Sequence, residues 1–156
     1  MEKTKKLKRG KVSLQNKKSP AANYSKPELY TVATEIKAEN EDFLPTNIGD
    51  YALVKANISD SDDSLAGLKK RLNHRATYVV DCGFTMKLPA GYKVRAEASK
   101  KWAQRGLFVA NSYLEEDQLK LVVINIGHET PMLIEHKDSV AQIWVEPVYL
   151  FDWKLK

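Results

Sequence analysis

Between residues 77 and 148 the chain is divided into short segments that favour β-strands, each followed within a few residues by turn-forming residues. In residues 92–98, Val94, Ala96 and Ala98 alternate with charged side chains, which is the period of a half-buried strand. Residues 121–124 (LVVI) are apolar without a break, so we expect both faces of that strand to be covered. Many short strands with few helices predict an antiparallel sandwich or barrel. The expected strands are 77–81, 84–88, 92–97, 107–110, 119–125, 132–135 and 140–148.

The region before residue 77 gives a weaker β signal. Residues 29–33 and 51–56 are expected strands, and the stretch between them, 44–50, is rich in turn formers. Residues 57–75 break the pattern and form a polar insertion. Several helix N-cap residues lie between 59 and 64, and Leu65, Leu68 and Leu72 recur at helical spacing, which predicts one short surface helix.

The length of 156 residues and an apolar content of 43% suit one domain with a proper core, which we place at residues 27–150. The single cysteine, Cys82, excludes an internal disulfide. No apolar run reaches the roughly 18 residues that a membrane span needs, and the charged N-terminus does not resemble a secretion signal. We therefore expect an intracellular protein with no membrane partner.

The charge is divided unevenly along the chain. Residues 1–26 carry a net charge of +8, and since the whole chain carries +5, the rest sums to −3. This basic arm has few apolar residues and no periodicity, so we expect it to be disordered or held by an anionic or large-assembly partner. Its candidate partner-binding residues are Lys3, Lys5, Lys6, Lys8, Arg9, Lys11, Lys17 and Lys18. Tyr24 is its only aromatic residue, so it offers charge without stacking.

Residues 79–112 read VVDCGFTMKLPAGYKVRAEASKKWAQRGLFVANS, and residues 137–143 read KDSVAQI. These stretches resemble the dUTPase and dCTP deaminase superfamily, which has a strand closing on Leu/Ile-Pro-x-Gly-Tyr, then Pro-Arg-Ser-Gly-Leu-Ala, an apolar strand ending in Asn, and later Gly-Asp-Arg-Ile-Ala-Gln-Leu. The resemblance covers about 70 residues and implies a distorted jelly-roll that assembles as a homotrimer. It identifies the chain as a degenerate member of phage or viral type, which implies a location in the host cytoplasm or on a virion.

The phosphate-binding positions of the family are changed here. Where the family has adjacent Arg and Ser, this chain has Ser99 and Lys100, followed by Lys101 in place of Gly. A lysine contacts phosphate as a point charge but lacks the planar fork of arginine. Lys100 and Lys101 are therefore either phosphate contacts in a new geometry or solvated lysines at a turn, and we favour the second interpretation.

The next motif is lost more completely. In the family, a hairpin after the Asn strand covers the uracil and supplies the Asp that activates water. Here residues 112–119 read SYLEEDQL, about five residues shorter and without glycine. Hydrolysis needs a carboxylate within hydrogen-bond reach of the attacking water. We interpret Glu115, Glu116 and Asp117 as a solvated acidic turn.

The later motif is half retained. Asp138 and Gln142 match family positions, and Gln142 corresponds to a residue that holds substrate phosphate. The same residues also suit the capping of a turn before a core strand, so folding explains them equally well. In the tail, 151–156, Phe151 and Trp153 are either exposed partner contacts or pack against a neighbouring subunit, and we favour packing.

Other chemistry finds no support in the sequence. His74, His128 and His136 show no ligand-like spacing, so we expect no metal site. Cys82 lies where a buried strand enters a turn, which suits a small core residue. Three hypotheses remain: a non-catalytic trimeric structural or decoration protein, a divergent dUTPase or deoxynucleotide-binding protein that would need Mg²⁺ if active, and a nucleic-acid-binding module. We expect no other cofactor.

Overall fold

A computed structural model of the chain describes residues 34–60, 66–128 and 130–155, and the structural statements below concern these residues. The basic arm 1–26, the expected strand 29–33 and the N-cap residues between 61 and 64 lie outside them. Strands dominate the described chain, which confirms the predicted all-β class.

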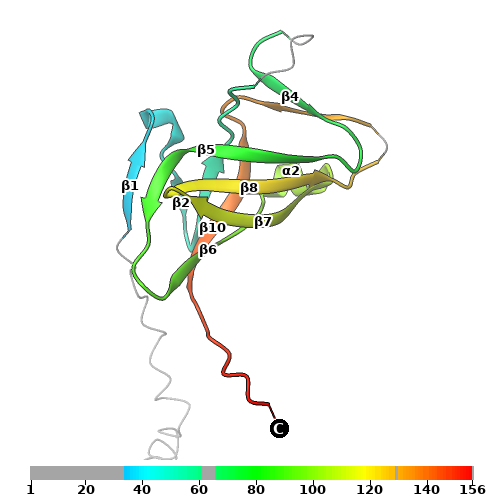
Figure 1. The fold of residues 1–156 in the computed structure, drawn as a ribbon. Helices are drawn as coiled ribbons and strands as arrows, with labels where there is room; N and C mark the ends of the chain where they lie inside the picture. Colours follow the sequence, from blue (N-terminus) through cyan, green and yellow to red (C-terminus); the bar gives the residue numbers. More distant parts are fainter. Residues whose placement is uncertain (1–33, 61–65, 129, 156) are drawn as a thin grey trace, which may run out of the picture. The chain divides into compact units, whose positions relative to one another are not determined.

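The strands form two four-stranded antiparallel sheets, ordered β1-β5-β8-β7 and β2-β3-β10-β6 (Figure 1). A pair of strands, β4 and β9, forms a third small sheet. The bounds in the first sheet are β1 Glu35–Ala38, β5 Thr77–Lys87, β8 Gln118–Asn125 and β7 Leu107–Glu115. Those in the second are β2 Thr46–Ile48, β3 Tyr51–Lys55, β10 Ser139–Pro147 and β6 Tyr92–Ala98, and those in the third are β4 Lys69–Leu72 and β9 Met132–Glu135.

One hydrophobic core joins the two large sheets. Val80 and Leu121 come from the first sheet and Val54, Val140 and Ile143 from the second, and all belong to the same buried cluster. Alternate residues of each strand supply this cluster, as expected when one face of a sheet packs on another and the other face meets solvent. The strand at residues 121–124 follows this rule. Val122 and Ile124 are only half-buried, so the expectation that both faces of this strand are covered is wrong.

Strand β5 is longer than the sequence predicts. The two expected strands, 77–81 and 84–88, are one strand with a bulge near Gly83, which has a φ of +71°. The backbone N–H of Gly83 donates to Oδ1 of Asp81 at 2.7 Å. A Cβ at residue 83 would lie 2.6 Å from Cγ of Phe43, so only glycine lets the Phe43 ring pack here.

The segment 57–75 differs from the prediction. Its described part contains β4, which pairs with β9, so the helix expected through Leu68 and Leu72 is wrong over these residues. Leu72 is buried while Leu68, which precedes β4, is exposed, so the two leucines do not share a buried helical face. The helical spacing of three leucines was outweighed by hydrogen bonds to a strand 60 residues away in sequence, a tertiary effect that local pattern does not carry.

Short helical pieces complete the described chain. η2 spans Glu41–Phe43 and is capped by Asn40, whose side chain accepts a hydrogen bond from the backbone N–H of Asp42. β2 follows it, so the turn-rich stretch 44–50 holds an edge strand as well as a turn. α2 (Lys100–Gln104) links β6 to β7. Neither helix has the length or the apolar content to cross a bilayer.

Candidate binding site

Helix α2 carries the first pair of predicted phosphate contacts. Lys100 and Lys101 lie in its first turn and are exposed, whereas the next residue, Trp102, is 1% exposed. The guanidinium carbon of Arg105 lies 4.5 Å from the centre of the Trp102 ring, so a cation covers the ring from the solvent side. The expected turn is therefore a short helix anchored by a buried tryptophan.

Asp138 and Gln142, the second pair, lie at the start of β10. Oδ2 of Asp138 accepts a hydrogen bond from the backbone N–H of Glu135 at 2.9 Å, and Lys137 between them has a φ of +71°. Asp138 therefore caps the turn before the strand, which supports the folding interpretation of this motif. Gln142 is half-buried and lies between Leu53 of β3 and Glu97 of β6.

The structure brings together the two segments that carry these pairs of residues, α2 and the start of β10. The backbone N–H of Ser99 donates to the carbonyl of Val140 at 2.9 Å, and the Ser99 hydroxyl donates to the carbonyl of Ser139 at 2.8 Å. The hydroxyl of the buried Ser99 thus ties the start of α2 to β10. None of Lys100, Lys101, Asp138 and Gln142 lines the cavity described below.

The acidic turn joins β7 to β8 by the shortest route. Glu115 pairs with Gln118, and the two residues between them, Glu116 and Asp117, have φ values of +49° and +64°. Positive φ at both central residues is the geometry of a two-residue type I′ hairpin. All three carboxylates of this turn are exposed, which confirms the interpretation as a solvated turn.

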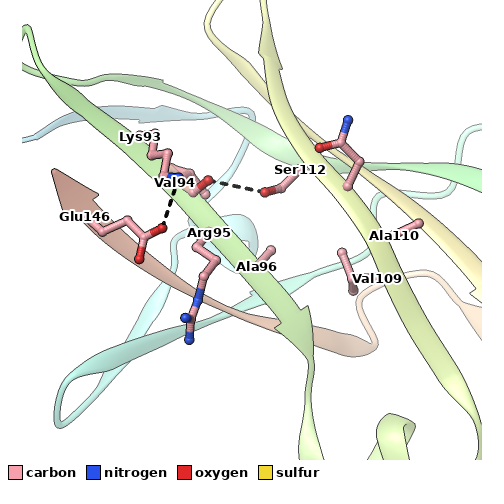
Figure 2. A pocket seen from close by; sticks show the side chains of 9 residues that line it. Lys93, Val94, Arg95, Ala96, Val109, Ala110, Ser112 and Glu146 are labelled. Atoms are coloured by element: carbon pink, nitrogen blue, oxygen red, sulfur yellow. Dashed lines mark hydrogen bonds and ion pairs between the residues drawn. The ribbon is translucent and has the colours of Figure 1, made fainter. Parts of the chain in front are cut away.

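A cavity of about 310 Å³ lies between the edges of the two sheets, where β6 and β7 face each other (Figure 2). β6 pairs only with β10 and β7 only with β8, so each strand has one edge outside its sheet. The Ser112 hydroxyl crosses the gap and donates to the carbonyl of Val94 at 3.3 Å. The residues that line the cavity are Lys93, Val94, Arg95, Ala96, Val109, Ala110, Asn111, Ser112 and Glu146.

A second cavity of about 180 Å³ continues the first along the same strands. It shares Lys93, Val94 and Ser112 with the first cavity, and its other lining residues are Leu88, Tyr92, Tyr113 and Leu114. We call the two cavities together the β6–β7 groove. Its lining mixes small or apolar side chains with polar and charged ones, among them Arg95, and Lys93 Nζ and a Glu146 carboxylate oxygen are 3.4 Å apart.

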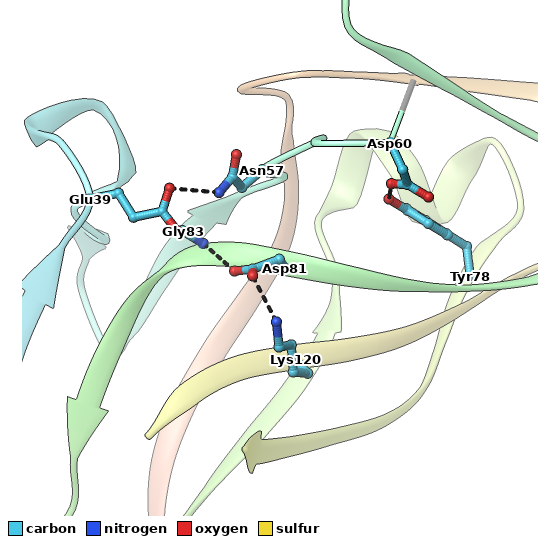
Figure 3. Close-up of polar contacts among 7 residues, drawn as sticks. All are labelled: Glu39, Asn57, Asp60, Tyr78, Asp81, Gly83 and Lys120. Carbon is cyan, nitrogen blue, oxygen red and sulfur yellow. Dashed lines mark hydrogen bonds and ion pairs between the residues drawn. The ribbon is translucent and has the colours of Figure 1, made fainter. Parts of the chain in front are cut away.

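Polar contacts elsewhere secure the scaffold of the first sheet (Figure 3). Lys120 Nζ and Oδ2 of Asp81 are 2.7 Å apart, and the carboxylate raises the pKa of Lys120 above its ordinary range. The Tyr78 hydroxyl donates to Oδ1 of Asp60 at 2.6 Å, and this bond lowers the pKa of Asp60. These four groups are engaged within the fold, and none of them lines the β6–β7 groove.

Cys82 and His136 also have structural roles. Burial raises the pKa of the Cys82 thiol far above its ordinary range, so the nucleophilic thiolate does not form. Nδ1 of His136 accepts a hydrogen bond from the backbone N–H of Ile58 at 3.1 Å. Among the described residues no group of three His, Cys, Asp or Glu side chains is placed to hold a metal ion.

Comparison with known proteins gives a structural likeness without a sequence match. No family model matches the chain, and no curated protein matches it. The EIAV dUTPase superimposes with a TM-score of 0.60 over 80% of this chain and 96% of that chain, at 8% identity. The described domain has a dUTPase-like fold.

Other solved dUTPases agree with this assignment. A Staphylococcus bacteriophage 80alpha dUTPase bound to dUpNHpp gives a TM-score of 0.59 at 11% identity, covering 81% of this chain and 89% of that chain. The Streptococcus mutans dUTPase gives 0.58 at 14% identity, covering 78% and 99%. Neighbours of the dUTPase-like fold thus come from a virus, a phage and a bacterium, and the resemblance over residues 77–148 predicted this fold correctly.

Sequence reasoning missed the β6–β7 groove. The groove exists because two strands end up at the edges of different sheets, and edge position is a property of the topology. The one local signal was the run of small side chains in residues 109–112, next to Ala96 on the facing strand. The groove is lined in part by residues of the family-like motifs, Leu88, Tyr92 and Asn111, whereas Lys100, Lys101, Asp138 and Gln142 lie outside it.

Proposed function

We propose that this chain is a non-catalytic protein that uses a dUTPase-like fold as a homotrimeric interaction module. Its role is structural, such as that of a phage or viral decoration or assembly protein acting in the host cytoplasm or on the virion. The basic arm 1–26 binds the larger anionic partner. The phage and viral origin of several structural neighbours supports the setting.

The β7–β8 hairpin is the observation that carries the non-catalytic assignment. Its two-residue turn leaves no stretch of chain to cover a base, and its carboxylates point into solvent. General-base catalysis contributes about 10²–10⁴-fold and needs a carboxylate held within hydrogen-bond reach of the water. Proximity contributes about 7–11 kcal/mol when the reactants are held in place. Both contributions lack a structural basis here.

Incubation with dUTP and Mg²⁺ tests this assignment directly. We expect pyrophosphate release far below about 1 s⁻¹, the low end of ordinary enzymatic turnover. An active dUTPase assayed in parallel shows that the conditions support hydrolysis. Turnover at about 1 s⁻¹ or faster would overturn the proposal.

A divergent dUTPase or deoxynucleotide-binding protein is the second candidate function. The hydrogen bonds from Ser99 to Ser139 and Val140 favour it, because they bring the segments of Lys100 and Gln142 together. Calorimetric titration with dUpNHpp separates binding from cleavage. Micromolar binding that Gln142→Ala and Lys100→Ala both weaken about tenfold would support this candidate, whereas the structural proposal expects no binding at that concentration.

Deleting residues 1–26 is expected to abolish binding to an anionic surface while leaving the fold intact. We choose a 30-base-pair DNA duplex as the probe, at about 50 mM salt. The arm carries +8 and the rest −3, so attraction must come from the arm. Binding by the full chain should fall steeply with salt as counterions are regained. Thermal melting of the truncated chain, measured by circular dichroism, should match that of the full chain.

A matched variant separates charge from length in this experiment. Glutamine at Lys3, Lys5, Lys6, Lys8, Arg9, Lys11, Lys17 and Lys18 keeps the arm but removes its charge. It should bind as weakly as the truncated chain. Unchanged binding by either variant at physiological salt would place the recognition surface on the β domain, with residues 100–102 the first to mutate.

A further inference from the structure

Three exposed cations lie at the end of the first sheet where β5 and β7 begin and β8 ends. Arg75 precedes β5, Lys101 lies in α2 and Arg105 follows α2. None of the three side chains forms an ion pair with a described carboxylate. Cations in other segments do have such partners, as in the pairs Lys69–Glu135, Lys93–Glu146 and Lys137–Asp42. We call Arg75, Lys101 and Arg105 the basic cluster.

Backbone hydrogen bonds bring the members of this cluster together from distant parts of the sequence. The backbone N–H of Arg75 donates to the carbonyl of Asn125 at 2.7 Å, and the backbone N–H of Ile126 donates to the carbonyl of Gly106 at 2.8 Å. The segments that carry Arg75 and Arg105 therefore flank the end of β8 on its two sides. Because neighbouring strands are about 4.8 Å apart, the backbones of these two segments are about 10 Å apart.

The segments that meet at the basic cluster contain no acidic residue. Residues 71–80, 98–114 and 118–128 include neither aspartate nor glutamate. Glu129, the next residue, lies outside the described part of the chain. Since the chain after residue 26 sums to −3, its acidic residues are concentrated in other segments. The described surface around the cluster is therefore locally positive on a mildly acidic domain.

These cations are held against local preference. Arg75 has a φ of +62°, which is uncommon for a residue other than glycine. Lys101 and Arg105 are four residues apart, a spacing at which like charges on a helix repel each other. Both lie over the Trp102 ring, with Lys101 Nζ at 6.0 Å and the Arg105 guanidinium carbon at 4.5 Å from its centre. Proteins break local rules of this kind at functional sites, and a bound anion would relieve the repulsion.

The chemistry and the extent of the cluster suit a chain of phosphates. A guanidinium presents a planar fork that binds two phosphate oxygens, and the Trp102 ring fixes that of Arg105 before a ligand arrives. A span of about 10 Å covers about three phosphates of one DNA strand, which repeat every 3.4 Å or so along the helix axis. None of the three cations lines a described cavity, so an extended polyanion fits this surface better than a single nucleotide.

We propose that Arg75, Lys101 and Arg105 bind the phosphate backbone of a nucleic acid. The inference rests on the proposed function, in which the arm with its charge of +8 attracts an anionic partner. A domain of net charge −3 does not attract a polyanion from a distance, so the cluster acts once the arm has brought the nucleic acid close. Contacts to phosphate fix the position of the nucleic acid on the domain without reading its sequence.

The first test removes two charges of the cluster in the full chain. Arg75→Gln combined with Arg105→Gln should weaken binding to the 30-base-pair duplex about tenfold, measured by fluorescence anisotropy. The slope of log K against log salt should fall by about 1–2, because each lost phosphate contact removes about 0.9. Lys37→Gln combined with Lys87→Gln is the matched control, since it removes the same charge from two exposed lysines outside the cluster. It should change the affinity less than about twofold.

The second test locates the contact without changing any charge of the cluster. Gln104→Cys places a thiol at an exposed position between Lys101 and Arg105. Cys82 is buried, so a photoreactive label attaches at residue 104 alone. The labelled chain should cross-link to the duplex on illumination, and a chain labelled at Lys87→Cys should not. This measurement holds even if the double arginine variant does not fold.

The outcomes separate this inference from the proposed function, with poly-glutamate as a second probe. Equal loss of duplex binding in both double variants, or equal cross-linking from residues 104 and 87, overturns the cluster and leaves the arm. A full chain that binds poly-glutamate but not the duplex points to an acidic protein as the partner, which overturns the inference alone. A full chain that binds neither probe at about 50 mM salt overturns both, because exposed cations bind polyanions most strongly at low salt. Selective loss in the arginine variant with cross-linking from residue 104 supports the inference.

Discussion

Replacing Gly106 by alanine is expected to lower the free energy of unfolding by about 2–5 kcal/mol. A Cβ on residue 106 would lie 2.2 Å from Cα of Gly127 and 2.4 Å from its nitrogen. The backbone of Gly106 also has a φ of +93°, which L side chains rarely adopt. The two segments that carry Gly106 and Gly127 cannot separate without loss, because the backbone N–H of Ile126 donates to the carbonyl of Gly106 at 2.8 Å. Urea denaturation followed by circular dichroism measures the loss.

Gly91→Ala is the control that isolates the backbone contribution. Gly91 also has a positive φ, +83°, but a Cβ there meets nothing within 4 Å. Its substitution should cost about 1 kcal/mol, the backbone strain alone. Equal losses at the two glycines would show that the close approach of Gly106 to Gly127 does not constrain the fold.

Trp102→Ala is expected to cost about 3–5 kcal/mol, the range for removing a buried tryptophan. Trp102 is 1% exposed and is the only buried residue of α2, so its loss leaves a cavity under that helix and removes the ring beneath Arg105. Thermal and urea denaturation should both show the loss.

Trp144→Ala gives the matched comparison. Trp144 is half-buried on the outer face of β10, where Arg95 lies 4.7 Å from its ring centre. The same truncation there creates no enclosed cavity and should cost less than half as much. If the two variants lose equal stability, Trp102 is not the anchor that fixes α2 between β6 and β7.

The sequence predicted the strands whose pattern is local and failed where pairing is distant. The alternation in residues 92–98 matches β6, and the predicted strand at 51–56 matches β3. Gly83 suggested a turn and proved to be a bulge, because its role depends on the Phe43 ring from another element. The leucines of 65–72 suggested a helix because nothing local reveals that β9 will pair there.

For the candidate site, too, local motifs could be found in the sequence and features set by the topology could not. The motif residues Asp138 and Ser99 could be located by their match to a pattern, and their hydrogen bonds join the segments that the pattern links. The groove could not be located, since it is defined by which strands lack a partner. That Lys100 and Lys101 contact a ligand remains a prediction.

The contrast between the β7–β8 hairpin and the β3–β10 pair has a consequence for the order of folding. The hairpin joins neighbours in sequence through two residues, and hairpins of this kind form within about 1–10 μs. β10 lies between β3 and β6, and Ser139 pairs with Lys55 from the opposite half of the chain. Closing so long a loop is slow, so substitutions in the hairpin should mainly change the refolding rate, and substitutions across β3 and β10 mainly the unfolding rate.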